Sequence, residues 1–157
     1  MSRTLDTLSP REVLALAIHV EQSNSRRFRA FAEVFQGYDP DVAKRFEELA
    51  AEEDHHEQLL DAQFRKKFGG TLPPLDQVDV SDVVEAVDLD DGEHLIFDTL
   101  KPRRVYELAL KAERGAQEFY RKALAQAGDP TLAALYRELA EMETGHASFL
   151  EEKLRTS

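Results

Sequence analysis

The sequence predicts an all-α protein: an antiparallel four-helix bundle of two helical hairpins joined by a long crossover. Four long segments carry apolar residues at helical spacing, short Gly and Pro turns divide them into two pairs, and one motif of charged residues occurs in each pair. We expect a single domain over residues 1–157, with hairpins at about 10–68 and 102–154 and a connection over 69–101.

The first hairpin begins with a helix start signal. Ser9 and Glu12 form a capping box around a proline, so a helix is expected over about 10–36. The run 37–40 contains Gly, Asp and Pro, and it predicts a tight turn that starts a second helix over about 40–68.

The second hairpin follows a long connection. Two glycines and two prolines open the segment 69–101, and a short helix is expected within it over 81–87. A third long helix is predicted over about 102–127. The Gly-Asp-Pro run at 128–130 forms the second turn, and a fourth helix is predicted over about 130–154.

Each predicted helix carries an apolar stripe at 3.6-residue spacing, which indicates a face turned toward a shared core. In chain order, the stripes comprise Leu14, Ala17, Ile18, Phe28, Phe31, Phe35; Phe46, Leu49, Ala50, Leu60, Phe64; Tyr106, Ala109, Leu110, Tyr120, Leu124; and Leu132, Tyr136, Leu139, Ala140, Leu150, Leu154. Each stripe is interrupted once, near its middle, by ionisable residues.

The interrupting residues repeat one pattern, a lone Glu on one helix and Glu-x-x-His on the next. The two copies are Glu21 with Glu53 and His56, and Glu113 with Glu143 and His146. The lone Glu lies 15 to 17 residues before its turn, and the Glu-x-x-His motif lies 15 to 18 residues after it. At about 1.5 Å per residue, antiparallel helices bring all six groups to one level, about 25 Å from each turn.

Six such groups at one level predict a two-metal site. A buried carboxylate without a partner costs many kcal/mol, and four together repel each other. Two divalent cations balance the four carboxylates, and oxygen ligands with two imidazoles favour iron or manganese over structural zinc. We therefore expect two Fe ions per chain, with Mn as the other candidate. A metal-free structural bundle is the remaining alternative.

Composition narrows the class of protein. The net charge of −11 disfavours nucleic-acid binding and suits cations, and the absence of Cys removes disulfides and iron–sulfur ligands. No apolar run has the length of a membrane span, and the N-terminus lacks the features of a signal peptide. We expect no membrane association and a cytoplasmic location.

Other polar residues near the motifs receive weaker assignments. Glu52 and His55 form a second Glu-x-x-His pair, but Met142 and Gly145 stand at the matching positions of the fourth helix, so we interpret the pair as flanking residues. His19 is expected at the surface, and His94 lies in the connection without an assigned role. We expect core positions for Tyr120 and Tyr136, with a hydrogen bond from either one to a ligand or to bound oxygen as the less favoured alternative. Asn24, Ser25 and Gln117 are expected beside the ligands.

The paired motifs resemble the rubrerythrin/erythrin branch of the ferritin-like diiron proteins, over about residues 9–67 and 102–154. The segments SPREVLALAIHVEQ and ELAAEEDHHEQLLDAQFRKKFG resemble most the erythrin part of membrane-bound bacterial iron exporters. The resemblance implies that Glu53 and Glu143 bridge the metals, that Glu21 and Glu113 are terminal carboxylates, and that His56 and His146 are terminal imidazoles.

Two departures from the family pattern bear on activity. Complete rubrerythrins carry a Cys-rich rubredoxin module, whereas this chain has no Cys, so a reductant must be external. Rubrerythrins also carry an extra carboxylate three residues after the lone Glu of the third helix, where this chain has Ala116. Six ligands are closer to a ferritin or bacterioferritin ferroxidase centre.

The expected function is therefore a diiron oxidoreductase that oxidises Fe(II) with O2 or hydrogen peroxide, as a ferroxidase or as a peroxidase with an external electron donor. The alternative is a non-enzymatic module that sequesters iron or delivers it to a partner. We expect a homodimer, and the long connection leaves exchange of hairpins between subunits open.

Overall fold

The computed structural model describes residues 4–73 and 102–156. It contains a short 3₁₀ helix η1 (Leu5–Thr7) and the long helices α1 (Pro10–Phe35), α2 (Pro40–Lys67), α5 (Pro102–Gln126) and α6 (Pro130–Thr156). The described residues form no strand. The predicted all-α class is confirmed, and the helix ends agree with the predicted ones to within two residues.

Local hydrogen bonds explain where three helices begin. The Ser9 Oγ atom accepts from the Glu12 amide at 3.2 Å, and the Glu12 carboxylate accepts from the Ser9 amide at 3.1 Å. Asp39 accepts from a backbone amide of the first turn of α2. Asp129 does so at α6, accepting from the amide of Leu132 at 3.2 Å.

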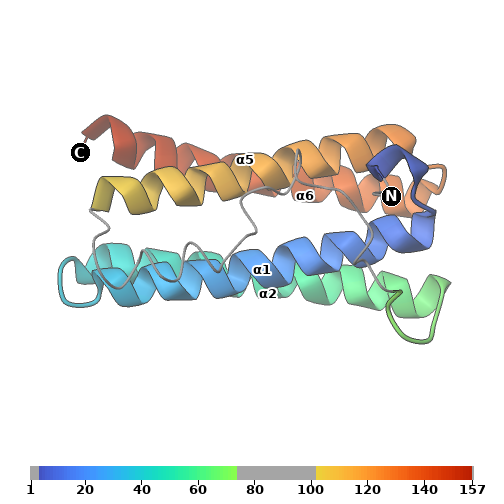
Figure 1. Ribbon diagram of the computed structural model, residues 1–157, viewed down its shortest axis with the longest axis horizontal. Coiled ribbons are helices and arrows are strands. Elements are labelled where there is room, and N and C mark those ends of the chain that lie inside the picture. The colour runs from blue at the N-terminus through green and yellow to red at the C-terminus, as the bar shows by residue number, and fades with distance from the viewer. Residues whose placement is uncertain (1–3, 74–101, 157) are drawn as a thin grey trace.

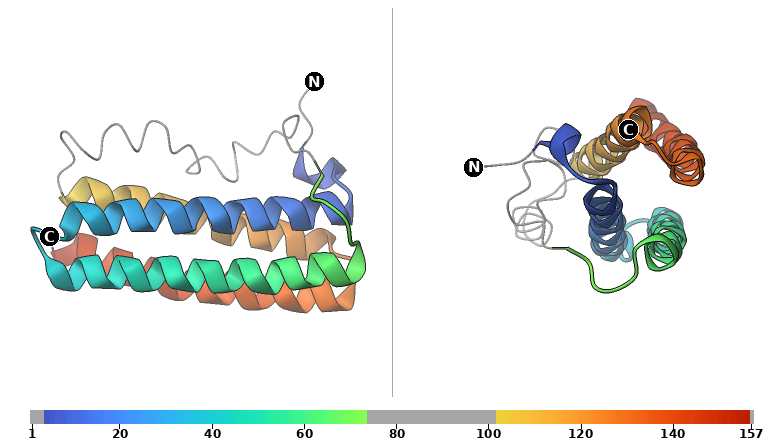
Figure 2. Two further views of the ribbon diagram at one scale, coloured as in Figure 1. Left: turned by 90° about the horizontal axis from the view of Figure 1, so that it is seen from below. Right: turned by 90° about the vertical axis from the view of Figure 1, so that its right-hand side faces the viewer.

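The helices pair as two antiparallel hairpins, α1 with α2 and α5 with α6 (Figure 1). The two hairpins pack together mainly through α1 and α5, and the four helices surround one axis in the end-on view of Figure 2. Helix α2 ends and helix α5 begins at opposite ends of the bundle, as the predicted crossover requires. Two glycines with positive φ, Gly69 (65°) and Gly70 (69°), lead the chain away from α2.

Part of the connection lies outside the described residues. The short helix expected over 81–87 and the side chain of His94 belong to that part. None of the described helices is long and apolar enough to cross a membrane.

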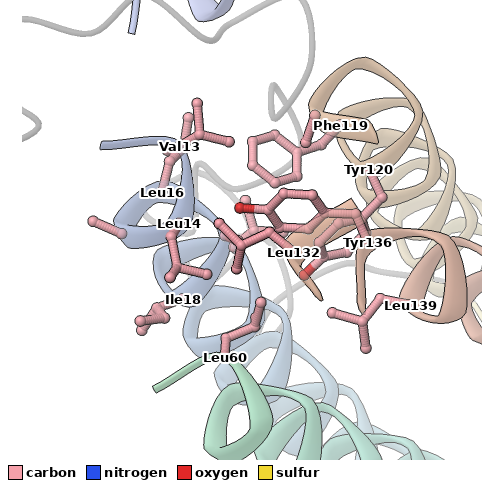
Figure 3. Close-up of a cluster of buried hydrophobic side chains, with 14 of the residues drawn as sticks. Val13, Leu14, Leu16, Ile18, Leu60, Phe119, Tyr120, Leu132, Tyr136 and Leu139 are labelled. Carbon is pink, nitrogen blue, oxygen red and sulfur yellow. The ribbon is translucent and has the colours of Figure 1, made fainter. Parts of the chain in front are cut away.

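The apolar core forms two clusters, one at each end of the bundle. The first cluster, drawn in Figure 3, includes Leu14, Leu16, Ile18, Leu60, Phe119, Tyr120, Leu132, Tyr136 and Leu139. The second cluster includes Phe28, Phe31, Phe35, Phe46, Leu49, Val105, Tyr106, Ala109 and Leu150. The predicted apolar stripes are buried, apart from Leu124, Ala140 and Leu154, which are half-buried. The residues that interrupt the stripes lie between the two clusters.

Candidate metal centre

The six ionisable residues of the repeated motif meet in the middle of the bundle. One comes from α1, two from α2, one from α5 and two from α6. The four carboxylates are 0% exposed, and the exposed fractions of His56 and His146 are 2% and 6%. The structure therefore brings together every residue that the sequence places at the site, at the common depth expected from the helix lengths.

These side chains form two overlapping groups. Glu21, Glu53, His56 and Glu143 make one group, and Glu53, Glu113, Glu143 and His146 make the other. Within each group, one ligand atom from every residue lies within 4.8 Å of those of the others. Because Glu53 and Glu143 belong to both groups, the arrangement offers two adjacent positions with two carboxylates in common.

The two imidazoles occupy equivalent places. The Nδ1 atom of His56 lies 3.2 Å from Glu143 and 3.5 Å from Glu21. The Nδ1 atom of His146 lies 3.0 Å from Glu53 and 3.4 Å from Glu113. The rings are nearly parallel, with centroids 6.1 Å apart and an angle of 11° between their planes. Each ring thus directs one nitrogen toward carboxylates of both hairpins, as terminal ligands of two neighbouring metals require.

Burial and mutual repulsion change the acidity of these groups. Burial, followed by the charge of neighbouring carboxylates, raises the pKa of Glu53 and Glu113 well above the ordinary value. Burial acts to lower the pKa of His56, but the carboxylates of Glu143 and Glu21, 3.2 and 3.5 Å from its Nδ1 atom, outweigh it and raise the pKa to about 10. The metal-free cluster therefore holds protons that a cation must displace.

Burial likewise acts to raise the pKa of Glu143, but other groups reverse the effect. The close approach of Glu113 and His56, together with the charge of the two imidazoles, brings the net pKa below its ordinary value. Glu143 is thus more readily ionised than Glu53 and Glu113, whose pKa values are raised.

The donor atoms fit a cation better than they fit each other. Among the described residues, both carboxylate oxygens of Glu53, Glu113 and Glu143, the Oε2 atom of Glu21 and the Nδ1 atoms of His56 and His146 are buried without a hydrogen-bond partner. Buried polar atoms are normally satisfied, and a set of six residues left in this state in a dense core is unusual. Two divalent cations would satisfy these atoms together.

Tyr120 lies in the core, as expected, and it also makes the hydrogen bond to a motif residue that the sequence left as the less favoured alternative. Its hydroxyl donates a 2.5 Å hydrogen bond to Oε1 of Glu21. Burial and the charge of Glu21 raise the pKa of Tyr120 well above its ordinary value, so the phenol keeps its proton. Tyr136 packs beside Tyr120 with ring centroids 6.1 Å apart, as Figure 3 shows. Its own hydroxyl has no hydrogen-bond partner among the described residues, in line with a core position.

Glu52 also contacts His146, which the sequence interpretation missed. Its Oε2 atom lies 2.8 Å from Nε2 of His146, on the side of the ring away from the carboxylate cluster. His55 is exposed and lines a surface pocket with Glu52, in agreement with a flanking role. His19 is exposed, as predicted.

The three polar residues expected beside the ligands behave differently from one another. Ser25 donates to Asp54 at 2.5 Å, and Gln117 donates to Thr144 at 2.8 Å, so both connect the helices within a hairpin. Asn24 is buried one turn beyond Glu21, and its amide atoms have no hydrogen-bond partner among the described residues.

Comparison with known proteins identifies a family and several similar structures. The sequence matches the Rubrerythrin family over residues 12–154. No curated protein matches the sequence significantly. Among solved structures, a hypothetical protein from Pyrococcus furiosus is similar at 25% identity, with a TM-score of 0.70, over 96% of this chain and 91% of that chain.

Two further structures share the fold at lower identity. One is a bacterioferritin from Rhodobacter capsulatus, described with a metal-free dinuclear site and haem iron: 22% identity, TM-score 0.71, covering 94% of this chain and 84% of that chain. The other is an uncharacterised conserved protein from Magnetospirillum magnetotacticum: 23% identity, TM-score 0.73, covering 96% of both chains. With the family match spanning nearly all of the chain, this protein belongs to the Rubrerythrin family and has the ferritin-like four-helix fold.

Proposed function

We propose that this protein binds two iron ions per chain and oxidises Fe(II) with O2 or hydrogen peroxide. The observation that carries the proposal is the pair of overlapping Glu/His groups, buried and without internal hydrogen-bond partners, that have two carboxylates in common. Two Fe(II) ions held by these residues would supply two electrons, which with two protons reduce one hydrogen peroxide to two waters, or one O2 to hydrogen peroxide.

The chain's own residues have distinct parts in this proposal. Glu53 and Glu143 hold both ions, because they alone belong to both groups. Glu21 and His56 complete one position, and Glu113 and His146 complete the other. The two apolar clusters on either side keep bulk water from the carboxylates, which strengthens their attraction for cations.

Ferroxidase activity is the form of this function that the residues favour. The side chain at 116 is a buried alanine, so the seventh carboxylate of the rubrerythrin pattern is missing. The chain contains no Cys that could pass electrons to the site, so sustained peroxide reduction needs an external donor. An iron-sequestering or iron-delivering module without turnover is the second candidate, and the same six buried donor residues support it.

Stopped-flow oxidation separates these functions. Protein loaded anaerobically with Fe(II) is mixed with O2 or with hydrogen peroxide, and Fe(III) absorbance is followed. A ferroxidase oxidises many added equivalents of Fe(II) per chain. A carrier stops after the bound ions. The matched control is Glu53→Gln, which removes a carboxylate common to both groups and should abolish the fast phase.

The role of the missing carboxylate has its own test. Ala116 lies one helical turn beyond Glu113, so Ala116→Glu places an oxygen ligand on the same side of α5. With an added reductant, this variant should gain peroxide turnover several-fold over the unmodified protein, measured as the rate of peroxide loss. Ala116→Gln is the uncharged control. Fast peroxide cycling by the unmodified protein, with no gain from Ala116→Glu, would contradict the ferroxidase assignment.

A further inference from the structure

The two ligand imidazoles differ on the side that faces away from the carboxylates. The Nε2 atom of His146 lies 2.8 Å from the carboxylate of Glu52. For each of the three carboxylates near His56, the closest approach is to its Nδ1 atom, and no other carboxylate of the described residues lies within 4.0 Å of its ring nitrogens. One imidazole therefore has an acidic partner behind it, and the other does not.

The difference originates in the sequence. In the aligned repeats, Met142 of α6 stands where Glu52 stands in α2, with an offset of 90 residues, the same as between the two Glu-x-x-His motifs. Both residues line one surface pocket of about 580 Å³ between α2 and α6, which also reaches His56 and His146. Each residue thus lies beside the histidines of the site, but a thioether is only a weak hydrogen-bond acceptor.

A carboxylate behind a metal-binding imidazole has a known physical effect. It accepts the Nε2–H proton, fixes the tautomer in which Nδ1 carries the lone pair, and makes that nitrogen a better donor to a cation. Removal of such a partner typically costs about 10- to 100-fold in metal affinity. The contact with Glu52 therefore strengthens His146 as a ligand and leaves His56 unchanged.

The hydrogen bond from Tyr120 to Glu21 also favours the group of Glu113 and His146, because it weakens the other group as a cation site. It occupies Oε1 of Glu21 and draws negative charge from that carboxylate. Glu113 has no hydrogen-bond partner for either oxygen among the described residues, so both remain available to a cation. The group of Glu21 and His56 is thus the weaker of the two on both counts.

We propose that Glu52 is a positioning residue for His146, and that the group of Glu113 and His146 takes up a divalent cation before the group of Glu21 and His56 and holds it more tightly. This inference rests on the proposed function, since it requires that the cluster binds two metal ions. It makes the position of Glu21 and His56 the one from which iron exchanges.

Anaerobic titration with Co(II), followed by calorimetry and by visible absorption, tests the order of filling. The unmodified protein should bind two ions in separate steps, with dissociation constants that differ at least tenfold. Glu52→Met, which copies the residue of the other half, should weaken the tighter step about 10- to 100-fold and leave the weaker step unchanged. Met142→Glu should tighten the weaker step. His55→Ala, in the same pocket, is the control and should change neither step.

Single-site variants assign the effect to one position. In protein carrying His56→Ala, the Co(II) binding step that remains should still be weakened by Glu52→Met. In protein carrying His146→Ala, Glu52→Met should leave the remaining step unchanged. Glu52→Gln, which keeps a hydrogen-bond acceptor without the charge, should restore part of the affinity. If Glu52 acted only through the general structure of the protein, Glu52→Met would lower the Co(II) affinity equally in the two histidine variants.

The failures of the two proposals are distinguishable. Two ions bound with equal affinity, and unaffected by Glu52→Met, would overturn the inference while metal binding stands. An equal response in the two histidine backgrounds would also overturn it. Failure of the unmodified protein to bind any Co(II) would overturn the proposed function itself.

Discussion

The two hairpins supply the same candidate ligands, but the residues around these ligands differ. Each contributes a lone Glu and a Glu-x-x-His motif, and these six residues converge with near-equivalent distances around the two imidazoles. Around them the equivalence ends. Glu21 accepts a hydrogen bond from Tyr120, and His146 contacts Glu52. The residue of α1 that matches Tyr120, seven positions after the lone Glu, is Phe28, which has no hydroxyl to donate.

One repeated motif is thus found in two unlike surroundings. The repeated residues determine which atoms meet at the centre of the bundle. The residues that differ between the copies determine how strongly each atom can hold a cation. Both distinguishing contacts cross between hairpins, from α5 to Glu21 and from α2 to His146. Each hairpin therefore supplies the residue that contacts a Glu or His of the other hairpin's motif.

The largest expected effect separates shared from unshared carboxylates. Glu53→Ala or Glu143→Ala should remove tight binding at both positions, because each residue belongs to both groups. Glu21→Ala or Glu113→Ala should remove one ion and leave the other. Equilibrium dialysis against Mn(II), with elemental analysis, measures the ions retained, and exposed Glu141→Ala is the control. The same loss for all four variants would mean that the two positions do not form separately.

A smaller effect concerns pH, because the metal-free cluster retains protons. The pKa of Glu113 is higher in the folded protein than its ordinary value of 4.5. The folded protein therefore loses stability as pH rises through the shifted pKa, because the buried carboxyl group must then ionise. The pKa of His56 is raised to about 10, so its contribution is complete below about pH 6.5 and is lost as pH rises toward 10. Glu143, with a lowered pKa, is ionised in both states above about pH 5.5 and adds no slope there.

Metal binding displaces these protons, so the stabilisation by metal should grow with pH. The expected result is a larger rise in Tm on addition of Mn(II) at about pH 8 than at about pH 5.5, measured by circular dichroism. The Glu53→Ala variant should show no rise at either pH. A Tm rise that is equal at the two pH values, or larger at the lower one, would contradict the assigned protonation.

The smallest effect concerns the two adjacent tyrosines. Tyr120→Phe should destabilise the metal-free protein by about 2 kcal/mol, since a hydrogen bond to a buried carboxylate is lost. Tyr136→Phe should change the free energy of unfolding by less than about 0.5 kcal/mol, because its hydroxyl has no partner among the described residues. Urea denaturation measures both. Equal changes would show that the contact with Glu21 adds nothing to packing.

The meeting of the six Glu and His side chains could be predicted from the sequence, because the signals that place them are local and periodic. Helix caps such as Ser9 and Asp39 define the helix starts, and the spacing from each turn fixes the depth of every residue along the bundle. Glu21 and Glu53 stand out because they interrupt apolar stripes. A repeated motif then restricts the pairing of hairpins, so the convergence of the six groups follows from helix geometry.

The contacts that distinguish the two halves could not be predicted in the same way. Glu52 lies off the apolar stripe of α2, where a charged residue is normally solvated, and its contact with His146 depends on how closely α2 and α6 approach. Tyr120 lies on a stripe, where an aromatic residue is normally part of the core. Its hydrogen bond depends on the offset between α1 and α5, which no helical period encodes.

The count of iron ions per chain tests the central claim most directly. The protein is incubated anaerobically with excess Fe(II), passed over a desalting column and analysed for iron and for protein by amino-acid analysis, beside Glu53→Ala treated identically. The two overlapping groups predict two ions per chain in the unmodified protein and fewer than one in the variant. A plateau at one ion, or no retained iron, in the unmodified protein would contradict the dinuclear site.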